Sequence, residues 1–92
     1  MEISCSLGDA ELKTQRERWL ALSPTARLEV DDGLRLTYAD DPAVEAELLE
    51  LVAVESECCS WATWTVERRE GELVMAARSS GHGVAVLHTM FR

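Results

Sequence analysis

Hydrophobic residues recur along this chain with two different periods, one typical of helices and one typical of strands. After "SLGD" near the start, Leu12, Trp19 and Leu20 fall on one face at helical spacing. Ser23 and Pro24 follow this segment, and the residue before a proline is disfavoured in helical conformation. The first segment is therefore predicted to be a helix that ends at Ser23-Pro24.

Two later segments alternate apolar and polar residues with a period of two. They are "ARLEVDDGLRLTY" and "SWATWTVERREGELVMAAR". The first contains Asp32-Gly33, a dipeptide that favours the two-residue type I′ turn of a β-hairpin. Glu70-Gly71 stands at the corresponding place in the second. Each segment is predicted to form a hairpin.

Helical spacing returns between the hairpins and again after the second one. "DDPAVEAELLELVAVESECC" begins with Asp41, a natural N-cap, and with Pro42, which suits the first helical position. The tail, "SSGHGVAVLHTMFR", places Val84, Leu87 and Phe91 on one face. These two segments are predicted to be the second and third helices.

The resulting order is α-ββ-α-ββ-α. Its natural arrangement is an α+β fold, a four-stranded antiparallel sheet with the helices packed on one face. The chain has 92 residues and no Pro- or Gly-rich linker, so residues 1–92 are expected to form a single domain.

Charge and composition narrow the choice of partners. The formal net charge of −8 argues against nucleic acid and anionic membranes, because both attract clustered Lys and Arg. No segment has the length of a membrane span, and the start lacks the pattern of a secretory signal. We expect a cytoplasmic protein whose three cysteines are free thiols, since an odd count does not suit a disulfide framework.

The second helix carries a carboxylate in its apolar stripe. On a helical wheel, Glu55 falls between Leu48 and Leu51, with Cys58 and Cys59 on its two sides. A carboxylate that faces a core costs several kcal/mol unless it is paired, protonated or bound to a metal. One explanation is an ion pair with Arg16 of the first helix. Others are a functional site and a register shift at the end of the helix that leaves Glu55 exposed.

The two adjacent cysteines allow three readings. Free cysteine is often buried, and packing alone can then explain its presence. A reactive thiolate is disfavoured, because Glu55, Glu57 and the carboxyl end of the helix all oppose the negative sulfur. The same surroundings favour a cation, and soft thiolates select zinc, copper(I) and mercury(II). We therefore predict a site for a soft metal ion or a thiophilic compound at Cys58, Cys59 and Glu55.

Two further residues complete this predicted site. Cys5 can supply a third sulfur if the start of the chain passes the end of the second helix. Trp61 follows the cysteines and is predicted to shield the thiols or to cover a ligand pocket, whereas Trp64 is predicted to belong to the core.

The stretches "CSL", "ELVAVESECCSWATWTV" and "GELVMAAR" together resemble a family of small actinobacterial-type proteins with an E-x-x-C-C motif. A similar segment follows the DNA-binding domain in some regulators of the MerR type. Members usually have Phe-rich sequence after the cysteines, where this chain has Trp61 and Trp64. The resemblance implies a binding or sensing module of metal or stress response, without the DNA-binding part.

The leading hypothesis is a small non-catalytic thiol module for a soft metal ion or thiophilic compound. One alternative is a thiol enzyme, either a redox enzyme or one that resembles organomercurial lyase in pairing two cysteines with an acid, here Cys58 or Cys59 with Cys5 as the thiols and Glu55 as the acid. Another is a homodimeric interaction domain whose cysteines only pack, with the apolar face of the third helix as its dimer surface.

Overall fold

The computed structural model describes residues 9–91, except for the side chains of residues 9–12 and of Cys58. Its elements follow the predicted α-ββ-α-ββ-α order, and their bounds are α1 (Asp9–Leu22), β1 (Ala26–Val30), β2 (Gly33–Ala39), α2 (Pro42–Cys58), β3 (Thr63–Arg69), β4 (Glu72–Arg78) and α3 (His82–Met90). The predicted α+β class is confirmed.

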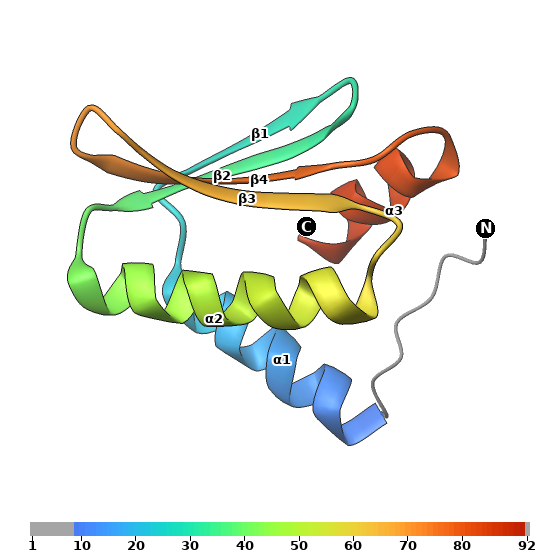
Figure 1. Ribbon diagram of the computed structural model, residues 1–92, viewed down its shortest axis with the longest axis horizontal. Helices are drawn as coiled ribbons and strands as arrows, with labels where there is room; N and C mark the ends of the chain where they lie inside the picture. Colours follow the sequence, from blue (N-terminus) through green and yellow to red (C-terminus); the bar gives the residue numbers. More distant parts are fainter. Residues whose placement is uncertain (1–8, 92) are drawn as a thin grey trace.

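The four strands form one antiparallel sheet in the order β1-β2-β4-β3. Figure 1 shows α1 and α2 stacked on one side of this sheet, with the last turns of α3 on the same side at one end. Because both central strands, β2 and β4, pair on two sides, they form the rigid middle of the sheet.

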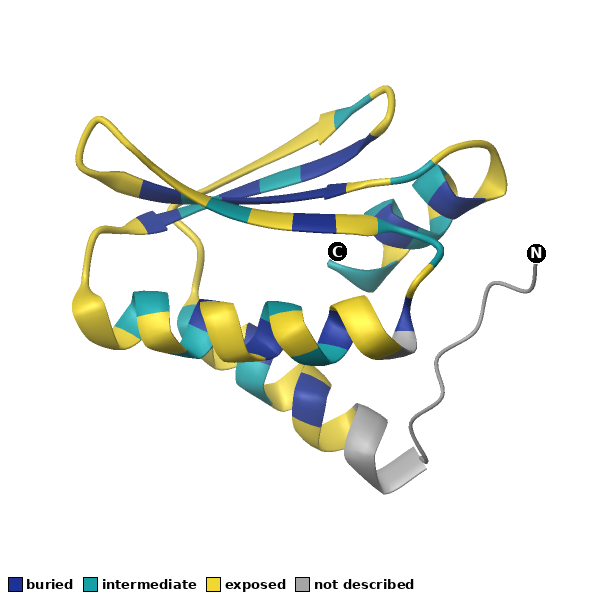
Figure 2. Ribbon diagram, in the orientation of Figure 1, coloured by how far each residue is buried: buried dark blue, intermediate teal, exposed yellow. Residues whose placement is uncertain are grey.

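The core fills the space between the sheet and α2. Figure 2 shows the buried positions on β2, β4 and the facing side of α2, whereas β1 is largely exposed. The largest fully buried side chains are Leu34 and Tyr38 of β2, Leu48 and Leu51 of α2, Leu73 and Met75 of β4, and Leu87 of α3. Trp64 is buried as predicted, with 8% of its surface exposed.

The two hairpins turn by different means. In the second hairpin, Glu70 and Gly71 have φ of 50° and 79°, the positive values that a type I′ turn requires. In the first, Val30 pairs with Gly33, so the turn residues are Asp31-Asp32 and the prediction of Asp32-Gly33 is wrong by one residue. Gly33 instead begins β2, where a Cβ would overlap the carbonyl of Ala77. This glycine serves close strand approach rather than the turn.

β1 faces its apolar residues away from the helices. Leu28 pairs with Arg35 on the outer face of the sheet and is 55% exposed. The inward neighbour, Arg27, donates hydrogen bonds to the carbonyls of His88 and Phe91, at 2.9 Å each. A cation at the carboxyl end of a helix is favourable, so β1 secures α3 through charge.

α1 is held to α2 largely by polar contacts. Gln15 is buried and donates to the Leu51 carbonyl at 3.3 Å, and Arg18 pairs with Glu47 at 2.6 Å. The predicted apolar stripe of this helix is only partly correct, because Trp19 is buried but Leu20 is 65% exposed.

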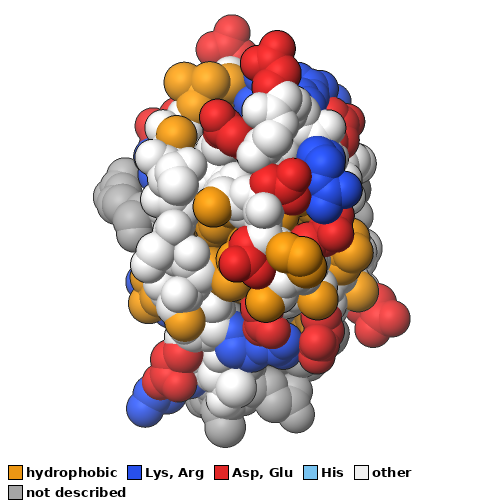
Figure 3. Space-filling view, turned by 90° about the vertical axis from the view of Figure 1, so that its left-hand side faces the viewer, with side chains coloured by type: hydrophobic (Ala, Val, Ile, Leu, Met, Phe, Trp, Pro, Cys, Tyr) orange, Lys and Arg blue, Asp and Glu red, His pale blue; other side chains and the backbone are white. Residues whose placement is uncertain are grey.

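Charged side chains cover much of the surface. Figure 3 looks at the end of the molecule where α2 begins, and acidic side chains are spread over that end with fewer basic ones between them. Arg68 contributes there by pairing with Asp40 and Glu45, at 3.0 Å each. Within residues 9–91, no helix is both long and apolar enough to cross a membrane.

Candidate functional site

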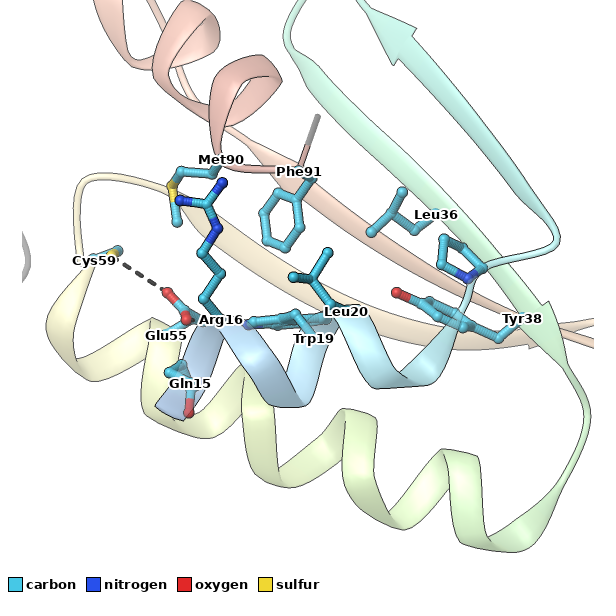
Figure 4. A pocket seen from close by; sticks show the side chains of 11 residues that line it. Gln15, Arg16, Trp19, Leu20, Leu36, Tyr38, Glu55, Cys59, Met90 and Phe91 are labelled. Carbon is cyan, nitrogen blue, oxygen red and sulfur yellow. Dashed lines mark hydrogen bonds between the residues drawn. The ribbon is translucent and has the colours of Figure 1, made fainter. Parts of the chain in front are cut away.

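A pocket of about 500 Å³ lies between α1, the carboxyl end of α2, β2 and the end of α3. Figure 4 shows the side chains that line it. They are Gln15, Arg16, Trp19, Leu20, Pro24, Leu36, Tyr38, Glu55, Cys59, Met90 and Phe91. Most are apolar or aromatic, so polar groups in this wall are few.

The last turn of α2 supplies two of those polar groups. Glu55 lies in this turn and Cys59 is the C-cap residue four positions on, so their side chains lie on the same side of the helix end, as the sequence predicted. They are 4% and 2% exposed. The Cys59 thiol donates to Glu55 Oε2 across 3.4 Å, the contact drawn as a dashed line in Figure 4. A carboxylate and a thiol therefore form a buried pair at the pocket wall.

Trp19 of α1 completes the surroundings of this carboxylate. Its indole Nε1 donates to Glu55 Oε1 at 3.2 Å. The predicted ion pair between Arg16 and Glu55 is not among the ion pairs of the described residues. Trp19 and Arg16 are three positions apart, and the crossing of α1 over α2 brings the indole inward and leaves Arg16 exposed.

The surroundings of Cys59 keep its sulfur protonated. Burial, the negative charge of Glu55 and the hydrogen bond to Glu55 together raise the pKa of the Cys59 thiol from 9.0 to about 12. This agrees with the prediction that the site opposes a free thiolate. A soft electrophile that replaces the proton removes this penalty, because the sulfur then carries no net negative charge.

Aromatic rings form the apolar part of the wall. Phe91 packs edge-on against Trp19, with ring centroids 5.1 Å apart and planes at 84°. Phe91 also packs edge-on against Trp64, with ring centroids 6.0 Å apart. Edge-to-face packing of this kind is favourable, and here it fixes the end of α3 against α1.

Another polar group of the wall is the Tyr38 hydroxyl. Tyr38 is 1% exposed and lies on β2, just before the residues that lead into α2. Figure 4 shows its hydroxyl pointing into the pocket, at the end away from Cys59. This oxygen is buried without a hydrogen-bond partner in the described part of the chain. Burial raises the pKa of the Tyr38 hydroxyl to about 12, so it is a neutral donor.

Of the other predicted site residues, two lie outside the described part of the structure and one lies outside the pocket lining. Cys5 lies outside the described residues, and so does the side chain of Cys58. Trp61 is not among the residues that line the pocket. It lies beside α3, where a Cβ on Gly83 would approach its ring to 3.3 Å, and its carbonyl accepts from Ser79. Within the described side chains, no three His, Cys, Asp or Glu residues gather as a metal site.

Sequence reasoning missed Trp19, Tyr38 and Phe91 as site residues. All three stand at apolar positions of predicted elements; Trp19 and Tyr38 are core residues, and Phe91 is partly buried against the core. Only the placement of α1 and α3 turns those rings into one pocket wall, so no local signal identified them.

Comparison of the chain with protein-family models, with curated proteins and with solved structures found no match. The resemblance to the E-x-x-C-C family and to the MerR-associated segment stays a prediction, and the geometry of the pocket carries the functional argument.

Proposed function

We propose that this protein is a non-catalytic binding module for a small thiophilic compound with an apolar body, such as a soft metal ion that carries an organic group. One observation carries the proposal, namely that Glu55 and Cys59 form a buried pair in the wall of a largely apolar pocket. The volume of about 500 Å³ falls in the usual range for small-molecule sites.

The walls favour an organic group over a bare ion. Trp19, Leu36, Met90 and Phe91 offer rings and aliphatic surface, which gain from contact with an apolar body. A bare zinc or copper(I) ion needs two or more sulfur or nitrogen ligands. Cys58 and Cys5 remain the predicted additional sulfurs for such an ion.

The binding step follows from the hydrogen bond between Cys59 and Glu55. The sulfur bonds the soft metal, the thiol proton moves to the Glu55 carboxylate, and the anion that the metal carried, for example chloride, departs. The metal thiolate and the carboxylic acid that remain in the pocket are both neutral, because the negative charge of the carboxylate leaves with the departing anion. Burial favours neutral groups, so the pocket supports the product.

The experiment uses a Cys5→Ser/Cys58→Ser variant, in which Cys59 is the single thiol. Phenylmercury(II) chloride is titrated into it, and mass spectrometry and tryptophan fluorescence follow binding. One equivalent bound to the folded variant, and none after the further change Cys59→Ser, is the expected result. Reaction only in denaturant would contradict the proposal and return Cys59 to a packing role.

The dependence of the rate on pH tests the part given to Glu55. With the carboxylate as proton acceptor, the rate is nearly flat from about pH 7 to 9. In the Glu55→Gln form of the same variant the proton must leave to solvent, so the rate rises about tenfold per pH unit. Equal slopes would remove Glu55 from the step. Release of benzene during the reaction would instead favour the enzyme alternative, because Glu55 would then have protonated the carbon.

A further inference from the structure

The buried hydroxyl of Tyr38 indicates what the far end of a ligand must offer. Tyr38 lies on the central strand β2 and pairs with Leu73 of β4, which fixes its position in the sheet. Its oxygen is enclosed, points into the pocket, and has no hydrogen-bond partner in the described part of the chain. Buried polar groups in folded proteins are nearly always paired, so an unpaired donor that faces a cavity requires an explanation.

We infer that the ligand of this pocket carries a neutral hydrogen-bond acceptor, such as a ketone, ester or ether oxygen, which accepts a hydrogen bond from the Tyr38 hydroxyl. This inference deepens the proposed function and rests on it only in taking the pocket as the binding site. It concerns the end of the pocket that Cys59 does not reach.

The surroundings of Tyr38 select a neutral acceptor over a charged one. Leu36, Trp19 and Leu20 are apolar or aromatic side chains of the lining, and Figure 4 shows Arg16, the cation of the lining, toward the Cys59 end and away from the Tyr38 hydroxyl. A carboxylate or phosphate placed there would lose its hydration with only one donor to replace it. A phenol that stays neutral and donates one hydrogen bond matches a single carbonyl or ether oxygen.

The test compares two naphthalene probes of similar size that contain no metal. They are 2-acetylnaphthalene and 2-ethylnaphthalene, which differ by a carbonyl oxygen in place of two hydrogens. Their dissociation constants are measured by NMR titration, following the indole resonances of the protein. The ketone is expected to bind about tenfold more tightly, because only it satisfies the buried donor.

Two variants test whether the Tyr38 hydroxyl causes the preference for the ketone. In Tyr38→Phe the two probes are expected to bind within about twofold of each other, with the affinity of 2-ethylnaphthalene unchanged. In Cys59→Ala, which removes the other thiol or hydroxyl donor of the wall, the preference for the ketone is expected to remain. If the preference is lost in Cys59→Ala but kept in Tyr38→Phe, the ketone binds at the Cys59 end of the pocket and the inference is wrong.

The remaining outcomes also decide the question. Equal affinity of the two probes for the unmodified protein overturns the inference, as does a preference that survives Tyr38→Phe. Failure of both probes to bind overturns it too, because the pocket then does not admit an apolar body of this size. The phenylmercury titration at Cys59 is a separate measurement, so the proposed function and this inference can fail independently.

Discussion

The two ends of the pocket treat their buried polar groups in opposite ways. At the α2 end, Glu55 accepts from the Trp19 indole and from the Cys59 thiol, so donors and acceptor satisfy one another. At the β2 end, the Tyr38 hydroxyl has no partner within the described residues. The hydrogen bonds of Glu55 stabilise the fold. The buried Tyr38 hydroxyl destabilises it, and a bound acceptor would restore that loss. This contrast distinguishes a structural network from an incomplete one.

High pH should weaken both ends at once, and we expect this to be the largest effect. The pKa values of Cys59 and Tyr38 rise from 9.0 and 10.0 to about 12 on folding. Below pH 9 both groups stay protonated whether the chain is folded or not, so the stabilisation is complete. From about pH 9 to 12 the unfolded chain loses these protons first, and the free energy of unfolding falls by several kcal/mol.

Urea titrations at a series of pH values measure this fall. In the Cys59→Ala variant, the fall in stability that begins near pH 9 should be absent. In Tyr38→Phe, the fall that begins near pH 10 should be absent. The same slope in all three proteins would show that neither group causes it.

Removing the Trp19 indole donor should destabilise the protein, because Glu55 then loses a hydrogen bond. Trp19→Phe keeps an aromatic ring but leaves the buried Glu55 carboxylate without one of its hydrogen bonds, and a lost bond to a charged group costs about 2 kcal/mol. Trp64→Phe is the matched control, because that indole donates only to the neutral Cys59 carbonyl, at 3.3 Å.

The control should cost about 1 kcal/mol, as expected for a bond between neutral groups. Chemical denaturation of both variants gives the comparison. Equal losses would mean that the Glu55 contact contributes no more than an ordinary hydrogen bond.

Removing the phenol oxygen should change the free energy of unfolding in the opposite direction, toward greater stability, and by a small amount. Tyr38→Phe deletes a buried donor that has no partner in the described part of the chain, so the free energy of unfolding should increase by about 1 kcal/mol. Thermal and urea unfolding measure it. A loss of stability would show that the hydroxyl is hydrogen-bonded in the free protein and would remove the contrast between the two ends.

Much of the fold was readable from local pattern. The order of elements, the Asp41 N-cap that accepts from the Ala43 amide at 2.8 Å, and the Glu70-Gly71 turn all depend on residues near one another. The position of Glu55 on the buried face of α2 followed from helical periodicity alone. Such features succeed because a few neighbouring residues determine them.

The errors concern contacts between distant segments. Leu20 and Leu28 were read as apolar positions of regular elements, yet both are more than half exposed, because α1 docks by polar contacts and β1 is an edge strand. Gly33 was assigned to a turn because the dipeptide Asp-Gly favours one. Its actual role depends on Ala77, which lies on a strand far along the chain.

Helical periodicity was sufficient to predict that Glu55 and Cys59 lie on the same buried side at the end of α2, because residues four apart along a helix are neighbours. The docking of α1 brings Trp19 rather than Arg16 to Glu55, and the packing around β2 leaves the Tyr38 hydroxyl at a cavity without a hydrogen-bond partner among the described residues. The reason is physical. Periodicity fixes which side of an element is buried, whereas the angle at which α1 and α3 dock fixes which buried groups meet.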